Sequence, residues 1–143
     1  MRSGSCVAIG EQKNSADAVI QCFYPGARGG EALADIIFGD VSPSGRLPVT
    51  FYADDSDLPD IREYSMKNRT YRFFEGNPVF KFGEGLTYSH IEEEWLDEKT
   101  VMLKNAGEFD TKYSVLLFSD DKKELKDFKK VFIRKNETVK VVF

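Results

Sequence analysis

The sequence predicts an α/β segment followed by an all-β unit, and three features of the pattern support this fold class. An apolar stripe at helical spacing covers residues 30–38, and Gly39 follows where a helix commonly ends in the left-handed region. Short runs of β-branched residues recur from Ile91 onward, separated by charged turns. Between these parts, residues 52–88 show no sustained period, which indicates an extended connector held by aromatic side chains.

The α/β segment is expected to begin and end with a strand. Residues 5–9 form a short apolar run that is typical of a buried strand. Ser15 is placed to cap a helix over residues 16–23, and a second helix is expected over residues 30–38. Residues 47–51 predict a further short strand. Two strands bury too little surface for this segment to stand alone.

The all-β unit is expected to be part of a β-sandwich. A charged turn over residues 119–127 and a tighter turn over residues 135–137 separate its later strands, and the tighter turn predicts a hairpin. Short strands with charged turns are typical of such sandwiches. Beyond the strand-like stretch that starts at Ile91, the strands are expected at residues 99–104, 112–118, 128–134 and 138–143.

Composition narrows the possible classes of function. The 143 residues are 41% hydrophobic and 31% charged, which is typical of a globular chain. A net charge of −4 gives no attraction to nucleic acid or anionic lipid, and no apolar run approaches the roughly 18 residues of a membrane span, so neither partner is expected. The two cysteines make no disulfide framework and the N-terminus shows no signal-peptide pattern, so the cytoplasm is the default location.

No catalytic constellation is recognisable from residue spacing. The glycines of ARGGEA and FGEG lack the partners of a phosphate loop or a dinucleotide site, so no cofactor is expected. His90 has no partner at a motif spacing, and this argues against a triad or a metal site. Glycoside hydrolysis needs two rigidly held carboxyl groups, whereas the acidic run between residues 54 and 60 is expected to be a solvated loop.

One stretch carries candidate contact residues. Basic and aromatic side chains interleave over residues 64–74, and such side chains bind sugars by stacking and hydrogen bonding. The neighbouring acidic residues argue against nucleic acid, and packing between domains is the favoured alternative to sugar contact. The candidate residues for sugar or interdomain contact are Tyr64, Arg69, Tyr71 and Arg72.

Three ordered motifs resemble glycoside hydrolase family 3, the β-glucosidases and β-xylosidases. The first is ADAVIQCFYPGARGGEALADIIFGDVSPSGRLPVTFY, which in that family closes the α/β sandwich domain after the catalytic barrel. The second is DLPDIREYSMKNRTYRFFEGNPVFKFGEGLTYS, and the third, LKDFKKVFIRKNETVKVVF, is similar to part of the family's fibronectin type III-like domain. Arg28 and Glu84 depart from the family pattern, in which an acidic residue and an aromatic residue are common at these places.

The resemblance implies three parts. Residues 1–52 correspond to the C-terminal part of the α/β sandwich domain, residues 53–90 to an aromatic-rich interdomain connector, and residues 91–143 to a truncated fibronectin type III-like domain. The family's aspartate nucleophile lies on the barrel, and its glutamate acid/base lies upstream of the matched segment. No catalytic residue is therefore carried over to this chain.

The resemblance also implies a function for the parent enzyme, which is a retaining β-glycosidase acting on β-linked gluco- or xylo-oligosaccharides. This chain is then expected to be a C-terminal fragment, inactive alone, whose partners are the missing barrel and the upstream half of the sandwich. Two alternatives remain open. In the first, the chain is a non-enzymatic carbohydrate-binding module. In the second, it is a subunit that complements a separately encoded catalytic half.

Overall fold

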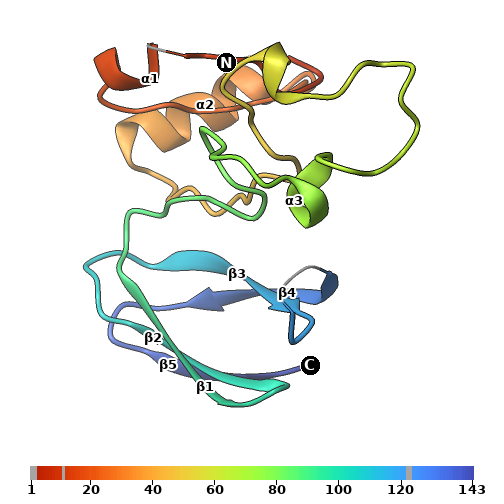
Figure 1. Ribbon diagram of the computed structural model, residues 1–143. Helices are drawn as coiled ribbons and strands as arrows, with labels where there is room; N and C mark the ends of the chain where they lie inside the picture. The colour runs from red at the N-terminus through yellow and green to blue at the C-terminus, as the bar shows by residue number, and fades with distance from the viewer. Residues whose placement is uncertain (1–2, 11, 122–123) are drawn as a thin grey trace. The chain divides into compact units, whose positions relative to one another are not determined.

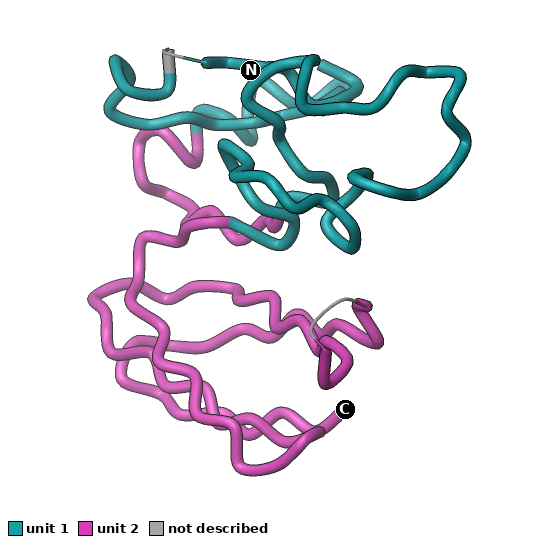
Figure 2. Tube along the Cα trace, viewed as in Figure 1, with its two compact units in different colours: residues 1–34, 47–84 teal, residues 35–46, 85–143 magenta. Residues whose placement is uncertain are grey.

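The computed structural model describes residues 3–10, 12–121 and 124–143, and it divides into two compact units (Figures 1 and 2). The first unit comprises Met1–Ala34 and Leu47–Glu84, and the second comprises Asp35–Arg46 and Gly85–Phe143. The units are interleaved along the sequence, because a segment from the middle of the α/β half belongs to the second unit.

Short helices and turns make up the regular structure described in the first unit. α1 spans Gln12–Ser15, η1 spans Asp55–Asp57 and α3 spans Thr70–Phe73. The longest helix, α2 at Gly29–Phe38, begins in this unit and confirms the helix expected over residues 30–38. Gly39 follows α2 with a φ of 85°, a conformation that glycine adopts without steric cost, and this confirms its predicted role as the helix terminator.

The other elements expected in the first half were wrong. Among the described residues, 5–9 form no strand, and no helix covers residues 16–23 because the helical run ends at Ser15. Phe23 has a φ of 49°, which is incompatible with a right-handed helix. Residues 47–51 contribute one isolated bridge instead of a strand. A strand forms only where a neighbour accepts its backbone hydrogen bonds, and this part of the chain offers few such neighbours.

The bridge that replaces the strand organises the interior of the first unit. The backbone N–H of Phe51 donates to the Phe80 carbonyl at 3.0 Å, and that of Val79 donates to the Phe51 carbonyl at 2.8 Å. The N–H of Leu47 donates to the Glu84 carbonyl at 2.8 Å and extends the pairing. Phe51 is fully buried and meets the Phe80 ring edge-on at 6.0 Å. An edge-to-face arrangement at this distance is a favourable geometry for two aromatic rings.

Two antiparallel sheets build the second unit (Figure 1). β1 (Ile91–Asp97), β2 (Thr100–Asn105) and β5 (Thr138–Val142) form a three-stranded sheet in the order β1-β2-β5. β3 (Thr111–Phe118) and β4 (Leu125–Ile133) pair with each other. The expected strands are therefore found, with the start of β4 three residues earlier than predicted. Lys122 and Lys123, in the expected charged turn, lie outside the described residues.

The core of the second unit draws on both of its sheets. Val101 and Leu103 come from β2, Val115 from β3, Ile133 from β4 and Val141 from β5, and all are buried. Alternate residues of a strand point to the same face, which places Val101 and Leu103 side by side in this core. The short runs of β-branched residues in the sequence thus supply this buried layer.

Candidate functional site

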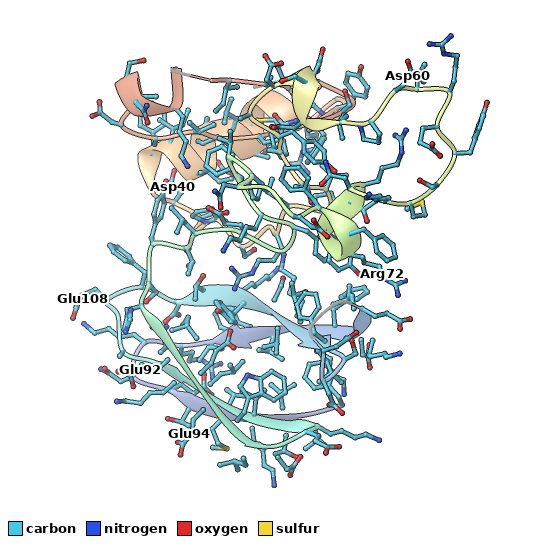
Figure 3. The ribbon with its side chains drawn as sticks, viewed as in Figure 1. Asp40, Asp60, Arg72, Glu92, Glu94 and Glu108 are labelled. Carbon is cyan, nitrogen blue, oxygen red and sulfur yellow. The ribbon has the colours of Figure 1, made fainter. Side chains whose placement is uncertain are left out.

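The four predicted contact residues lie in one stretch of the first unit but in different surroundings. Tyr64 is 92% exposed on a loop. Tyr71, on α3, stacks on Phe82 with ring centroids 4.0 Å apart and an interplanar angle of 13°. The guanidinium of Arg72, also on α3, lies 5.4 Å from the centre of the Phe73 ring (Figure 3). Of the two tyrosines, Tyr64 is the one that presents an open ring.

Arg69 is bound to the backbone of the loop that carries Tyr64. We call residues 58–66 the Tyr64 loop. The Nη2 of Arg69 donates to the carbonyl oxygens of Asp60 at 3.1 Å and Glu63 at 2.9 Å. The N–H of Glu63 donates to the same Asp60 carbonyl at 2.9 Å and closes a turn. Arg69 therefore fixes the shape of the Tyr64 loop.

A fork of two hydrogen bonds joins Asp60 and Arg62 on the same loop. The Nε and Nη2 of Arg62 donate to the Asp60 carboxylate at 3.0 and 2.9 Å. The Arg62 side chain, and then its backbone N–H, stabilise the ionised carboxylate and lower the pKa of Asp60 to about 2. The N–H of Ser65 donates to Glu63 Oε1 at 2.8 Å and lowers the pKa of that carboxyl. The charged groups of Asp60, Arg62 and Glu63 therefore form hydrogen bonds within the loop itself.

The acidic run before the Tyr64 loop behaves as a solvated loop. The Asp54 carboxylate accepts from the N–H of Ser56 at 2.9 Å, and Asp57 accepts from the N–H groups of Ala53 and Asp54. These bonds cap η1.

Throughout residues 3–10, 12–121 and 124–143, no group of three or more histidine, cysteine or acidic residues is placed to hold a metal ion. No helix in those same ranges is long and apolar enough to cross a membrane.

A second arrangement, which the sequence did not predict, lies within the second unit. We call it the Arg46 clamp. The Nη1 of Arg46 donates to the Gly85 carbonyl at 2.7 Å, and its Nε donates to the Ser114 carbonyl at 3.3 Å. The guanidinium also lies over the Tyr113 ring, 4.6 Å from its centre, and the Ser114 hydroxyl donates to the Ser44 carbonyl at 3.2 Å. The clamp ties the segment before Leu47 to strand β3.

Three hydroxyl groups close the other end of that segment. The Oγ of Ser42 lies 2.7 Å from the Oγ1 of Thr87, which lies 2.7 Å from the Oγ1 of Thr111, and Thr111 donates back to Ser42 at 3.0 Å. The space beside the Arg46 clamp is about 10 Å³, which is room for roughly one water molecule. The arrangement therefore joins chain segments and is too small to hold a sugar.

Neither arrangement had a local signal in the sequence. The partners of Arg46 and Ser44 lie 39 to 70 positions further along the chain. The sequence predicts only a turn over residues 43–45, because nothing in the local spacing shows what Ser44 and Arg46 will contact. His90, whose spacing argued against a triad or a metal site, is exposed.

A mixed segment with few helices, followed by antiparallel sheets, matches a region of known glycosidases. The model of the glycosyl hydrolase family 3 C-terminal domain matches residues 1–88. The chain belongs to this family, as its motifs predicted. It is similar over that region to β-xylosidases and β-glucosidases.

Two curated relatives illustrate the match. The chain is 51% identical to the xylan 1,4-beta-xylosidase of Xylanibacter ruminicola, over 63% of this chain and 10% of that protein. It is 34% identical to a putative beta-xylosidase of Formosa agariphila, over 96% of this chain and 21% of that protein. The chain spans between 10% and 24% of the lengths of the first curated relatives it matches.

Two solved structures share the fold over almost the whole chain. The GH3 exo-beta-xylosidase XlnD, in complex with a xylobiose aziridine probe, has a TM-score of 0.83 at 26% identity, covering 99% of this chain and 25% of that one. The beta-glucosidase of Kluyveromyces marxianus, in complex with glucose, has a TM-score of 0.79 at 28% identity, covering 98% of this chain and 20% of that one.

Proposed function

We propose that this chain is the C-terminal portion of a retaining β-glycosidase. Residues 1–52 are the end of its α/β sandwich domain, residues 53–90 the connector, and residues 91–143 part of a fibronectin type III-like domain. The observation that carries the proposal is the family match over residues 1–88, combined with coverage of only a tenth of a relative that is 51% identical. Five strands in two antiparallel sheets support the last part.

β-Linked xylosides are the proposed substrates of the parent enzyme. Several of the relatives bear β-xylosidase names, and the XlnD structure holds a xylobiose-derived probe. The retaining reaction uses one carboxylate to attack the anomeric carbon and another to protonate the leaving oxygen, after which water releases the sugar. We expect xylosides to be cleaved faster than glucosides.

This chain supplies scaffold and no catalytic carboxylate. Retention requires two carboxyl groups about 5 to 5.5 Å apart on rigid elements that flank a bound sugar. In the 54–60 run, the carboxylates of Asp54 and Asp57 instead cap η1, and that of Asp60 accepts from Arg62. The family resemblance places both catalytic carboxylates outside this chain, so we expect the chain to be inactive alone.

Hydrolysis of 4-nitrophenyl β-D-xyloside and β-D-glucoside by the purified 143-residue chain tests this proposal. The rate is expected to equal that of an identically purified empty-vector control with both substrates. A rate above the control that survives further purification would overturn the assignment of a purely scaffolding role.

A further inference from the structure

The Tyr64 loop carries large apolar side chains that are exposed. Ile61 is 87% exposed, Tyr64 is 92% exposed and Met66 is 49% exposed. These three lie within six residues of one another, in a loop where polar residues would be expected at full exposure. Exposed apolar groups gathered on one segment mark a surface that another molecule covers.

The backbone beneath these side chains is held in one shape. Arg69 donates to two carbonyls of the loop, at 3.1 and 2.9 Å, and Asp60 and Arg62 form their fork inside it. The Nδ2 of Asn68 donates to the Asp57 carbonyl at 2.9 Å and closes the base of the loop. A loop with its own framework loses little freedom on binding, so its exposed side chains can contribute their full contact energy.

The chemistry of the loop favours a protein surface over a sugar. A sugar site combines an aromatic face with free polar groups that hydrogen-bond the hydroxyls. Here both carboxylate oxygens of Asp60 accept from Arg62, and Arg69 is bound to backbone carbonyls. Ile61 offers a bare aliphatic side chain, which neither stacks on a sugar ring nor bonds to a hydroxyl. An apolar patch of polypeptide suits both Ile61 and Tyr64.

We infer that Ile61 and Tyr64 dock on the part of a family 3 enzyme that this chain does not cover, with Arg69 as the positioning residue that shapes the loop. The inference rests on the proposed function. The occupant follows from length, because at least three quarters of the length of each of these relatives lies outside the region that this chain matches. The docking is assigned to Ile61 and Tyr64, because the Tyr71 ring is stacked on Phe82 and the Arg72 guanidinium lies beside the Phe73 ring.

Site-specific thiol labelling tests the docking directly. The experiment compares the 143-residue chain with a chimera, in which this chain replaces the matching C-terminal region of the Xylanibacter ruminicola enzyme. Cys6 and Cys22 are replaced by serine in both. Ile61→Cys and Tyr64→Cys report on the loop, and Phe128→Cys, on β4 and 65% exposed, is the matched control in the other unit. Labelling rates are measured by mass spectrometry.

Both loop cysteines are expected to label at least about tenfold more slowly in the chimera than in the chain alone, with a smaller change at the control. Arg69→Ala in the Tyr64→Cys background is expected to restore fast labelling in the chimera, and Arg69→Lys to restore it less. Equal loop rates in an active chimera would overturn the docking and leave the proposed function intact. Protection that appears only when xylo-oligosaccharide is added would also overturn it, in favour of sugar contact. A chimera without xylosidase activity would contradict the proposed function, and the docking with it.

Discussion

The Nη1 of Arg46 donates to the carbonyl oxygen of Gly85 at 2.7 Å, which joins two residues 39 positions apart in the sequence. The same guanidinium reaches the carbonyl of Ser114 on β3. A rigid planar fork with several donors can serve two carbonyls at once, which a lysine ammonium on a flexible stem does less well. Arg46 thus holds residues 35–46 against the sheets of the second unit.

Replacing Arg46 tests the strength of this clamp. Arg46→Ala is expected to lower the free energy of unfolding of the second unit by about 1.5–3 kcal/mol, because a charged donor to two partly buried carbonyls is lost. Arg46→Lys is expected to cost less. Chemical denaturation followed by fluorescence reports on this unit, since Trp95 on β1 is the only tryptophan in the sequence. Arg62→Ala, in the other unit, is the control, and an equal effect there would contradict the prediction.

Asn105 is the polar centre of the second unit and should be intolerant of change. It is fully buried at the end of β2, where its Nδ2 donates to the carbonyls of Phe109 at 2.8 Å and Ile133 at 3.2 Å. Its Oδ1 accepts from the Ser89 hydroxyl and the Gly107 N–H. Asn105→Ala leaves several buried groups unpaired and is expected to cost about 2–4 kcal/mol.

Asn105→Asp separates hydrogen bonding from side-chain size. The aspartate keeps the volume and one acceptor but removes the donor to Phe109 and Ile133, so we expect it to destabilise the second unit at least as much as alanine. Thermal denaturation by circular dichroism, with Glu94→Ala on the exposed face of β1 as control, checks this. A fall in melting temperature no larger than in the control would contradict it.

The interleaving of the units predicts the outcome of a truncation. A chain that starts at residue 85 keeps every strand but loses Ser42, Ser44 and Arg46. It leaves Thr111 and Ser114 without these partners on β3. We expect a melting transition that is broader and lower than that of the same unit in the 143-residue chain. Trp95 fluorescence follows both, and identical transitions would show that residues 35–46 add nothing to the unit.

The Asp60–Arg62 fork predicts a pH dependence confined to the Tyr64 loop. The folded pKa of Asp60, about 2, is below the unfolded value of about 3.9, so the fork favours the ordered loop above about pH 4. This contribution is lost as pH falls from about 4 through about 2. NMR titration of the Asp60 carboxyl carbon measures the shift. Arg62→Gln is expected to return the pKa toward about 3.9, and an unchanged midpoint in that variant would contradict the assignment.

Local pattern predicted one helix and the strands of the second unit correctly, but it also predicted a helix over residues 16–23 that does not form. The helix α2 and the strands from β1 to β5 follow from periodicity and turn residues. Local pattern could not show whether residues 47–51 form a strand, because a strand needs a hydrogen-bonding neighbour that its own residues do not specify. Only the bridge from Phe51 to Phe80 forms there.

The sequence predicted only part of the candidate site. Interleaved aromatic and basic residues marked the stretch that includes Tyr64 and Tyr71, but composition treats the two tyrosines alike. The fold stacks Tyr71 on Phe82 and leaves Tyr64 open. Nothing in the sequence indicated the Arg46 clamp, because the carbonyl groups that Arg46 binds lie far along the chain.

Hydrolysis of 4-nitrophenyl β-D-xyloside by three proteins decides whether this chain completes a family 3 glycosidase without being catalytic itself. They are the 143-residue chain, the Xylanibacter ruminicola enzyme lacking its matching C-terminal region, and the chimera that joins the two. The account predicts activity in the chimera alone, with xyloside cleaved faster than the corresponding glucoside. Hydrolysis by the 143-residue chain itself, together with an inactive chimera, would contradict it.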